Sequence, residues 1–310
     1  MENTRVVILI ILSVVACVVG TTGCSPGGGT TGSVSPEWPQ LGSPTKIEPG
    51  VLLYEATLTR GTTPVRVWIY LPEVHAKSIP AILIAPAGSP LLHGMTLGAG
   101  DRPEHLPYVR EGFAVIAYEI EGAVPERAPW SEAIAGAKQF ESAGYGVADA
   151  RLALDFALAR VPEIDKTKVI SAGHSSAATL SLLVAAGEPR IRGCIAYAPV
   201  CDVGLHLSHE TLTVFSKMYP NAESFFSNSS PMNHIDELHC SVFLFHALDD
   251  SVVPPGTVID FAERLKRSNP NVTLVTVARG NHYNSMIDEG IPAAIRWAKT
   301  LTAYTAAPKP

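Results

Sequence analysis

The sequence has little positive charge: 23 Lys and Arg residues stand against 29 Asp and Glu, for a net charge of −6. Proteins that bind nucleic acid carry a basic surface that neutralises phosphates, so the composition argues against a nucleic-acid partner. Charged residues make up only 17% of the 310 positions and hydrophobic residues 46%, which excludes an intrinsically disordered chain.

Cysteine is also scarce. Five cysteines without a Cys-x-x-Cys pair exclude a disulfide scaffold and a cysteine-based zinc site. His206 and His209 are three residues apart, but no carboxylate or thiol is in register with them, so they are interpreted as solvated loop residues. No metal and no cofactor is expected. A chain of this length can bury a large core without such cross-links.

The apolar run near the N-terminus is too short for a permanent membrane span. Val6–Val19 follows Arg5 and would form about 21 Å of helix, whereas a bilayer core is about 30 Å thick. The run suits the hydrophobic region of a secretory signal peptide. The sequence therefore predicts a signal peptide over residues 1–23 and a flexible Gly/Ser/Thr/Pro-rich tether over residues 24–46.

The end of this segment, Thr22-Gly23-Cys24-Ser25, resembles a bacterial lipoprotein signal, in which the cysteine is lipidated and becomes the mature N-terminus. Cys17 is the alternative, but it would leave a shorter hydrophobic region. We expect an exported protein that is anchored to a bacterial membrane through a lipid on Cys24, or secreted. An uncleaved membrane anchor is the remaining alternative.

The body of the chain alternates between short apolar runs and helical patterns, which predicts one α/β domain over residues 47–304 and a short tail over 305–310. Eight strands are expected in a mostly parallel sheet with helices on both faces, the first two strands forming an antiparallel hairpin. The expected strands are 51–59, 65–71, 81–85, 113–118, 168–172, 194–198, 242–245 and 272–277. The expected helices are 103–110, 147–160, 176–186, 256–266 and 285–300.

Two stretches interrupt this alternation. Residues 119–144 are rich in Ala, Gly and Pro and are expected to form a loop over the carboxyl edge of the sheet. Residues 202–238 form a longer insertion that contains several aromatic residues. Long insertions in compact domains are often lids or binding loops, and a packed helical segment is the alternative for part of this one.

The sequence Gly173-His174-Ser175-Ser176-Ala177 lies between an apolar strand and an apolar helix. A nucleophile elbow has this pattern, because its tight turn requires small residues two positions before and two after the nucleophile. Ser175 is therefore the predicted nucleophile. The neighbouring His174 is interpreted either as lining the acyl pocket or as a packing residue.

Two further strands end in residues that suit a serine hydrolase. Asp250 follows the strand at 242–245, and His282 follows the strand at 272–277. The order Ser175, Asp250, His282 is that of the Ser-Asp-His triad in α/β-hydrolases. A serine hydroxyl attacks a carbonyl only when a base removes its proton. The histidine supplies that base, and the aspartate orients it.

At these motifs the chain resembles the α/β-hydrolase superfamily, and within it the dienelactone hydrolases and the prolyl oligopeptidase (S9-like) catalytic domains, over about residues 50–300. The acid loop of such domains reads His-Gly-x-x-Asp-x-x-Val-Pro, which matches residues 246–254 and selects Asp250 over Asp249. The alignment leaves His246 as a hydrogen-bonding residue of the acid loop.

The resemblance also implies an oxyanion hole built from two backbone N–H groups. One is that of Ser176, and the other belongs to the loop after the strand at 81–85. Because Pro86 has no N–H, Ala87 is the predicted second donor, with Gly88 as the alternative.

Together these residues predict a serine hydrolase that cleaves carboxylic esters of small molecules through an acyl-enzyme on Ser175. A peptidase that uses the same triad on short peptides is the first alternative. A non-catalytic binding protein on a hydrolase fold is the second, because a fold by itself does not determine function. The oligomeric state is left open.

Overall fold

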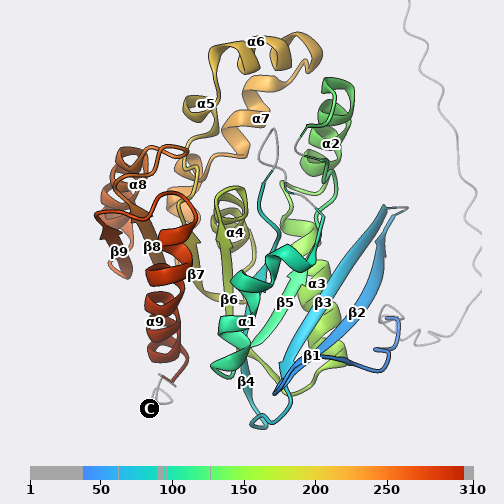
Figure 1. Ribbon diagram of the computed structural model, residues 1–310. Helices are drawn as coiled ribbons and strands as arrows, with labels where there is room; N and C mark the ends of the chain where they lie inside the picture. The colour runs from blue at the N-terminus through green and yellow to red at the C-terminus, as the bar shows by residue number, and fades with distance from the viewer. Residues whose placement is uncertain (1–37, 62, 89–93, 95, 126, 304–310) are drawn as a thin grey trace, which may run out of the picture. The chain divides into compact units, whose positions relative to one another are not determined.

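A mostly parallel sheet organises the computed structural model, which describes residues 38–303 except 62, 89–93, 95 and 126 (Figure 1). Nine strands lie in this part of the chain. They are β1 (Thr45–Glu48), β2 (Val51–Arg60), β3 (Thr63–Pro72), β4 (Ile79–Ile84), β5 (Ala114–Tyr118), β6 (Ile164–His174), β7 (Ile191–Tyr197), β8 (Ser241–Ala247) and β9 (Val272–Val277). Their order in the sheet is β1-β2-β3-β5-β4-β6-β7-β8-β9.

The strands from β5 to β9 in this order run parallel, whereas β1, β2 and β3 pair antiparallel and join the sheet beside β5. Continuous apolar runs, such as the fully buried β5, form strands that are covered on both faces. All eight predicted strands are present. The ninth, β1, lacks an apolar run and begins at Thr45, two residues before the predicted start of the domain.

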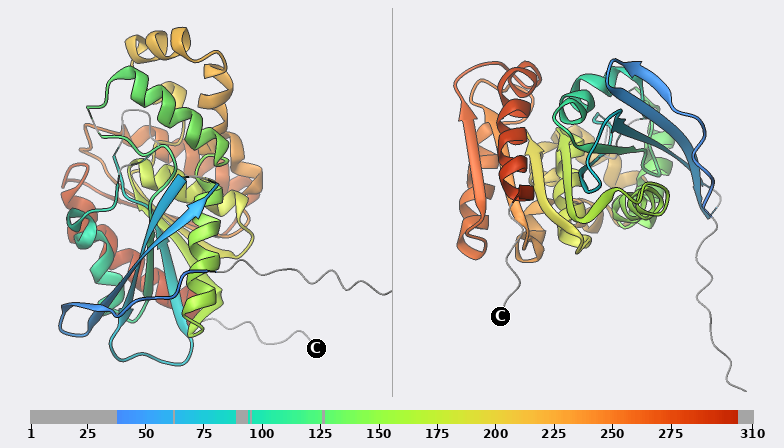
Figure 2. Two further views of the ribbon diagram at one scale, coloured as in Figure 1. Left: turned by 90° about the vertical axis from the view of Figure 1, so that its right-hand side faces the viewer. Right: turned by 90° about the horizontal axis from the view of Figure 1, so that it is seen from below.

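Helices cover both faces of the sheet, as Figure 2 shows from below. The helices are α1 (Arg102–Arg110), α2 (Trp130–Ser142), α3 (Val147–Arg160), α4 (Ser176–Gly187), α5 (Val203–His206), α6 (His209–Met218), α7 (Ala222–Asn228), α8 (Pro255–Ser268) and α9 (Ile291–Ala303), with the short turns η1 (Ala99–Asp101), η2 (Pro231–Glu237) and η3 (Met286–Gly290). Helices α3, α4 and α8 bury their apolar side chains against one face, and α1 and α9 against the other. The two faces thus carry separate cores.

The segment predicted as a loop over residues 119–144 contains helix α2, so that prediction was wrong. The helix forms because tertiary packing buries one side of it, including Ile134, Ala137 and Phe140. Its backbone comes so close to the loop after β5 that a Cβ on Gly122 would lie 2.0 Å from the carbonyl oxygen of Gly136.

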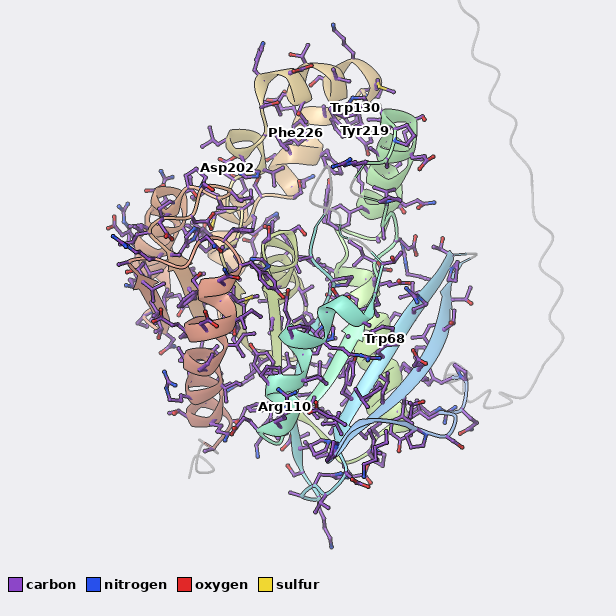
Figure 3. The ribbon with its side chains drawn as sticks, viewed as in Figure 1. Trp68, Arg110, Trp130, Asp202, Tyr219 and Phe226 are labelled. Carbon is purple, nitrogen blue, oxygen red and sulfur yellow. The ribbon has the colours of Figure 1, made fainter. Side chains whose placement is uncertain are left out.

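The insertion at 202–238 is a packed helical segment made of α5, α6, α7 and η2. Phe215 and Tyr219 stack with ring centroids 4.9 Å apart, and Phe225 contacts the rings of Phe140 and Tyr145. Figure 3 shows Tyr219 and Phe226 of the insertion on the same side of the molecule as Trp130 of α2. The aromatic residues of the insertion therefore form a cluster with α2.

Several predictions from the sequence fall on residues outside the described part of the chain. These are the signal peptide, the lipidated Cys24, its alternative Cys17, most of the tether and the C-terminal tail. Within residues 38–303, as far as they are described, no helix is both long enough and apolar enough to cross a membrane.

We predict that Gly122→Ala destabilises the protein more than Gly112→Ala. Both glycines have positive φ, +85° and +93°, so alanine costs about 1–2 kcal/mol of conformational strain at either position. Only at Gly122 would the new methyl group also meet backbone, which adds roughly 1–3 kcal/mol, whereas Gly112 has open space around it. Urea denaturation measures both losses. Equal losses would show that the contact with Gly136 is not rigid.

Candidate active site

The predicted site residues follow four strands of the sheet at their carboxyl ends. Ala87 follows β4, Ser175 follows β6, Asp250 follows β8 and His282 follows β9. Strand β6 lies next to β4 in the sheet, although β5 separates them in the sequence. In open parallel sheets ligands bind at the carboxyl ends of strands where the strand order reverses, and this site lies at such a point.

Ser175 occupies a sharp turn between β6 and α4. Its backbone is at φ 54° and ψ −120°, a conformation that non-glycine residues rarely adopt. A Cβ on Gly173 would lie 2.2 Å from the carbonyl oxygen of Ala177, so position 173 accepts only glycine. The Ser175 N–H donates to the Tyr197 carbonyl at 2.9 Å and joins the turn to β7. This geometry is that of a nucleophile elbow.

The carboxylate of Asp250 is fully buried and accepts hydrogen bonds on both oxygens. The N–H groups of Val252 and Val253 donate to Oδ1 at 2.8 and 3.0 Å. Oδ2 lies 2.7 Å from Nδ1 of His282 and 3.1 Å from Nε2 of His246. Burial by itself would raise the pKa of Asp250, but the hydrogen bonds, His246 and His282 first, hold it well below its ordinary value.

His246 contacts the acid loop, in agreement with its interpretation from the sequence. Its Nε2 also lies 2.9 Å from the carbonyl oxygen of Val253. Because both neighbours of Nε2 are acceptors, Nε2 carries a proton and donates to Asp250 and Val253.

Asp249, the aspartate not selected from the sequence, holds the backbone before His282. Its carboxylate accepts from the N–H groups of Asn281 at 2.9 Å and Gly280 at 3.2 Å. Gly280 has a φ of +123°, which glycine adopts without strain, whereas Asn281, with a φ of +54°, is a non-glycine residue in the left-handed region. The two adjacent aspartates therefore bind different parts of one loop, which the sequence pattern did not reveal.

Helix α4 begins beside the loop that follows β4. The Gly88 N–H donates to Ser176 Oγ at 2.8 Å. The N–H groups of Ala87 and Ser176 have no acceptor among the described residues. The N–H group of Gly88, the alternative oxyanion donor, is therefore bonded to Ser176.

The contact between the elbow and His282 runs through His174. Its Nε2 lies 3.0 Å from the carbonyl oxygen of His282, and the two imidazole centroids are 4.6 Å apart. No hydrogen bond between Ser175 Oγ and the His282 ring occurs in the described part of the structure. Such bonds are often long in the absence of substrate and shorten when it binds.

A partly buried carboxyl group, that of Glu104 in α1, lies next to His174. Its Oε1 is 3.8 Å from His174 Nδ1. Burial, with a smaller contribution from Asp101, raises the pKa of Glu104 to about 8. Burial and the nearby charge of His282 lower the pKa of His174 to about 4. Both groups are therefore neutral at pH 7. Nothing in the local sequence of α1 indicated this pair.

The insertion contributes His206 near the same site. Burial lowers the pKa of His206, and the charge of His282 lowers it further. A cavity of about 160 Å³ separates α5 from the acid loop. Its lining is mostly apolar and consists of Val200, Cys201, Asp202, Leu205, His206, Val252, Val253, Pro254 and Thr257. Among the described residues no cluster of three or more His, Cys, Asp or Glu could hold a metal ion.

The sheet, its covering helices and the strand–elbow–helix turn define an α/β-hydrolase. The chain belongs to the prolyl oligopeptidase family, whose model matches residues 103–306, and it is therefore a serine hydrolase. A comparison with curated protein sequences gives no match.

Solved structures with this fold include both esterases and peptidases. Acetyl xylan esterases from Paenibacillus sp. R4 and Thermoanaerobacterium sp. JW/SL YS485 are 18% and 20% identical, each with a TM-score of 0.63. The matches cover 84% and 87% of this chain and 88% and 89% of theirs. A puromycin-hydrolyzing peptidase from Mycobacterium tuberculosis is 18% identical, with a TM-score of 0.64 over 82% of this chain and 40% of its own.

We predict that Glu104→Gln flattens the pH dependence of stability. The folded protein keeps the Glu104 proton up to about pH 8, whereas the unfolded chain releases it near pH 4.5. The stabilisation that this bound proton gives the folded state is fully present below the pKa of Glu104 in the unfolded chain. It is lost as the pH rises through 8, at up to about 1.4 kcal/mol of unfolding free energy per pH unit. The amide of Gln at position 104 does not titrate, so this pH-dependent loss of stability should be absent from the variant.

Urea denaturation between about pH 5 and pH 9 measures this difference. Glu132→Gln, at an exposed position in α2, is the matched control and should give a curve parallel to that of the wild type. If the Glu104→Gln curve were also parallel, Glu104 would not bind its proton more tightly in the folded state.

Proposed function

We propose that this serine hydrolase cleaves small carboxylic esters through an acyl-enzyme on Ser175, with His282 and Asp250 as the other triad members. The hydrogen bond between Asp250 and His282, beside an elbow that presents Ser175, is the observation that carries this proposal. The buried, ionised Asp250 accepts from Nδ1 of His282 and so leaves Nε2 as the basic nitrogen.

In the proposed reaction Ser175 Oγ attacks the ester carbonyl carbon while His282 Nε2 accepts the hydroxyl proton. The negative charge that develops on the carbonyl oxygen is stabilised by the N–H groups of Ala87 and Ser176. His282 then donates its proton to the leaving alcohol. Water, activated by the same nitrogen, releases the carboxylic acid and restores Ser175.

One observation favours esters over peptides. The matches to the acetyl xylan esterases cover 88% and 89% of those chains, whereas the matches to the peptidase from M. tuberculosis and to an acylaminoacyl peptidase from Pyrococcus horikoshii cover 40% and 41% of theirs.

Peptide hydrolysis is the second candidate, because the family model that matches the chain is that of a peptidase family. The same triad serves both reactions, since an ester and an amide differ in the basicity of the leaving group. A binding protein without catalysis is the third candidate. The elbow that presents Ser175 and the hydrogen bond between Asp250 and His282 weigh against it.

The lipoprotein-like sequence around Cys24 supports export and a lipid anchor on a bacterial membrane, with secretion as the alternative. This location is part of the proposal. Mass spectrometry of the mature N-terminus from membranes of a bacterial host tests it, with Cys24→Ser as the variant that should lose the lipid. A lipid found on Cys17 would instead identify Cys17 as the processing site.

We predict that Ser175→Ala abolishes the turnover of short-chain p-nitrophenyl esters and stoichiometric labelling by a fluorophosphonate. The variant lacks the atom that forms the acyl-enzyme, so at least about a 10³-fold loss is expected. Proline and alanine p-nitroanilides are assayed in parallel. Ser224→Ala, at an exposed position of the insertion, is the control and should retain both properties.

Faster turnover of the anilides, also lost in Ser175→Ala, would assign the protein to the peptidases. If wild type and Ser175→Ala showed the same background rate on both the esters and the anilides, the proposal that Ser175 is a catalytic nucleophile would be rejected.

We predict a far greater loss of kcat for Asp250→Asn than for Asp249→Asn. The amide at position 250 would turn an N–H toward Nδ1 of His282 and favour the wrong tautomer, a change that costs about 10⁴-fold. Among the described residues Asp249 contacts only backbone N–H groups, so kcat of its amide variant should fall less than about tenfold. Steady-state ester hydrolysis measures both, and the reverse order would make Asp249 the acid.

A further inference from the structure

His174 lies between the two halves of the proposed catalytic machinery. It precedes Ser175 in the elbow and is 5% exposed. Its ring contacts His282 at 4.6 Å and Tyr283 at 5.6 Å between centroids. Its Nε2 is 3.0 Å from the His282 carbonyl oxygen. The side chain therefore touches the catalytic histidine at both its ring and its backbone.

The hydrogen bond to a carbonyl determines which nitrogen of His174 carries the proton. A carbonyl oxygen only accepts, so Nε2 must donate and, in the neutral ring, Nδ1 is unprotonated. Nδ1 faces the Glu104 carboxyl group at 3.8 Å. The raised pKa of Glu104, about 8, keeps that carboxyl protonated at neutral pH. A protonated Glu104 carboxyl beside Nδ1 is compatible with the His174 tautomer that carries its proton on Nε2. An ionised Glu104 would instead favour a proton on Nδ1.

The His282 loop needs such a contact. Asn281, whose φ of +54° is rare for a non-glycine residue, precedes His282, and strained backbone persists only where its surroundings hold it. Asp249 fixes the N–H groups of Gly280 and Asn281, and Asp250 fixes Nδ1 of the ring. Neither contact stops the ring from swinging about its bond to Asp250. The contacts with His174 restrict that movement.

We propose that His174 is a positioning residue that holds His282 toward Ser175 through its Nε2–H donor, and that protonated Glu104 selects the tautomer with that donor. The inference rests on the proposed function. Neither residue touches the reacting atoms in this proposal, and each acts through His282.

The first test compares His174→Phe with His174→Gln in ester hydrolysis by the full-length protein. Phenylalanine keeps a ring but has no donor, so kcat should fall about 10- to 100-fold with a much smaller change in KM. The rate of fluorophosphonate inactivation should fall by a similar factor. Glutamine supplies an N–H donor at similar reach and should recover most of both rates.

His105→Phe is the matched control. His105 is another buried histidine, one residue from Glu104 in the sequence, and its ring packs on Tyr70 rather than on the site. Its variant should retain kcat within about twofold. Equal losses in His105→Phe and His174→Phe, or no recovery in His174→Gln, would overturn the inference. If His174→Phe does not fold, His174→Met, which also lacks the donor, takes its place.

The second test is the pH profile of kcat for Glu104→Gln. The charged or titratable groups around the pair are Asp101, Tyr108, Tyr197, His246, Asp250, His282 and Tyr283. Wild-type kcat should decline above about pH 8 as Glu104 ionises, whereas the variant should stay flat because its amide remains neutral. Superimposed profiles would overturn the role of Glu104.

These outcomes are distinct from failure of the proposed function. If Ser175→Ala retained full turnover, the triad and the positioning role would both fall. If Ser175→Ala lost turnover while His174→Phe behaved like His105→Phe, the triad would stand and only the positioning role would be rejected.

Discussion

The close approach of two backbone segments at the elbow is the constraint on which the site depends. A side chain at Gly173 would overlap the carbonyl of Ala177, so the tight turn between β6 and α4 requires glycine at this position. Ser175 consequently adopts φ 54° and lies at the end of a central strand. The same turn positions the neighbours of Ser175. Ser176 Oγ accepts a hydrogen bond from the Gly88 N–H, and the His174 ring lies against His282.

Two carboxyl groups near this elbow, Asp250 fully buried and Glu104 partly buried, are in opposite protonation states for a physical reason. Asp250 accepts from two backbone N–H groups and two imidazoles, which outweigh the cost of burial and keep it ionised. Glu104 has no such donors in the described part of the chain, and its pKa is raised by partial burial and by Asp101, so it remains protonated. Groups whose environments push their pKa values apart often have different roles in one mechanism.

The sequence predicted the features that depend on local pattern. Buried strands appear as apolar runs, and the small residues around Ser175 mark a turn that the structure confirms. Features that depend on long-range packing were missed. Helix α2 forms against residues distant in sequence, and β1 has no apolar run. The contact of Glu104 with His174 brings α1 against the elbow, although the two are far apart in the sequence. No local sequence pattern therefore predicts it. The lipid on Cys24 and the triad roles stay predictions.

The contacts of Trp38 have a consequence for access to the protein. Its carbonyl accepts from Arg160 at the end of α3, and its ring packs on Phe156. Helix α3 precedes β6, so its end lies at the amino ends of the parallel strands, whereas Ser175 lies at their carboxyl ends. Trp38, the first residue that the structure describes, thus packs at the pole of the sheet opposite Ser175. Its contacts therefore leave the carboxyl ends of the strands, where the predicted triad lies, uncovered by Trp38 itself.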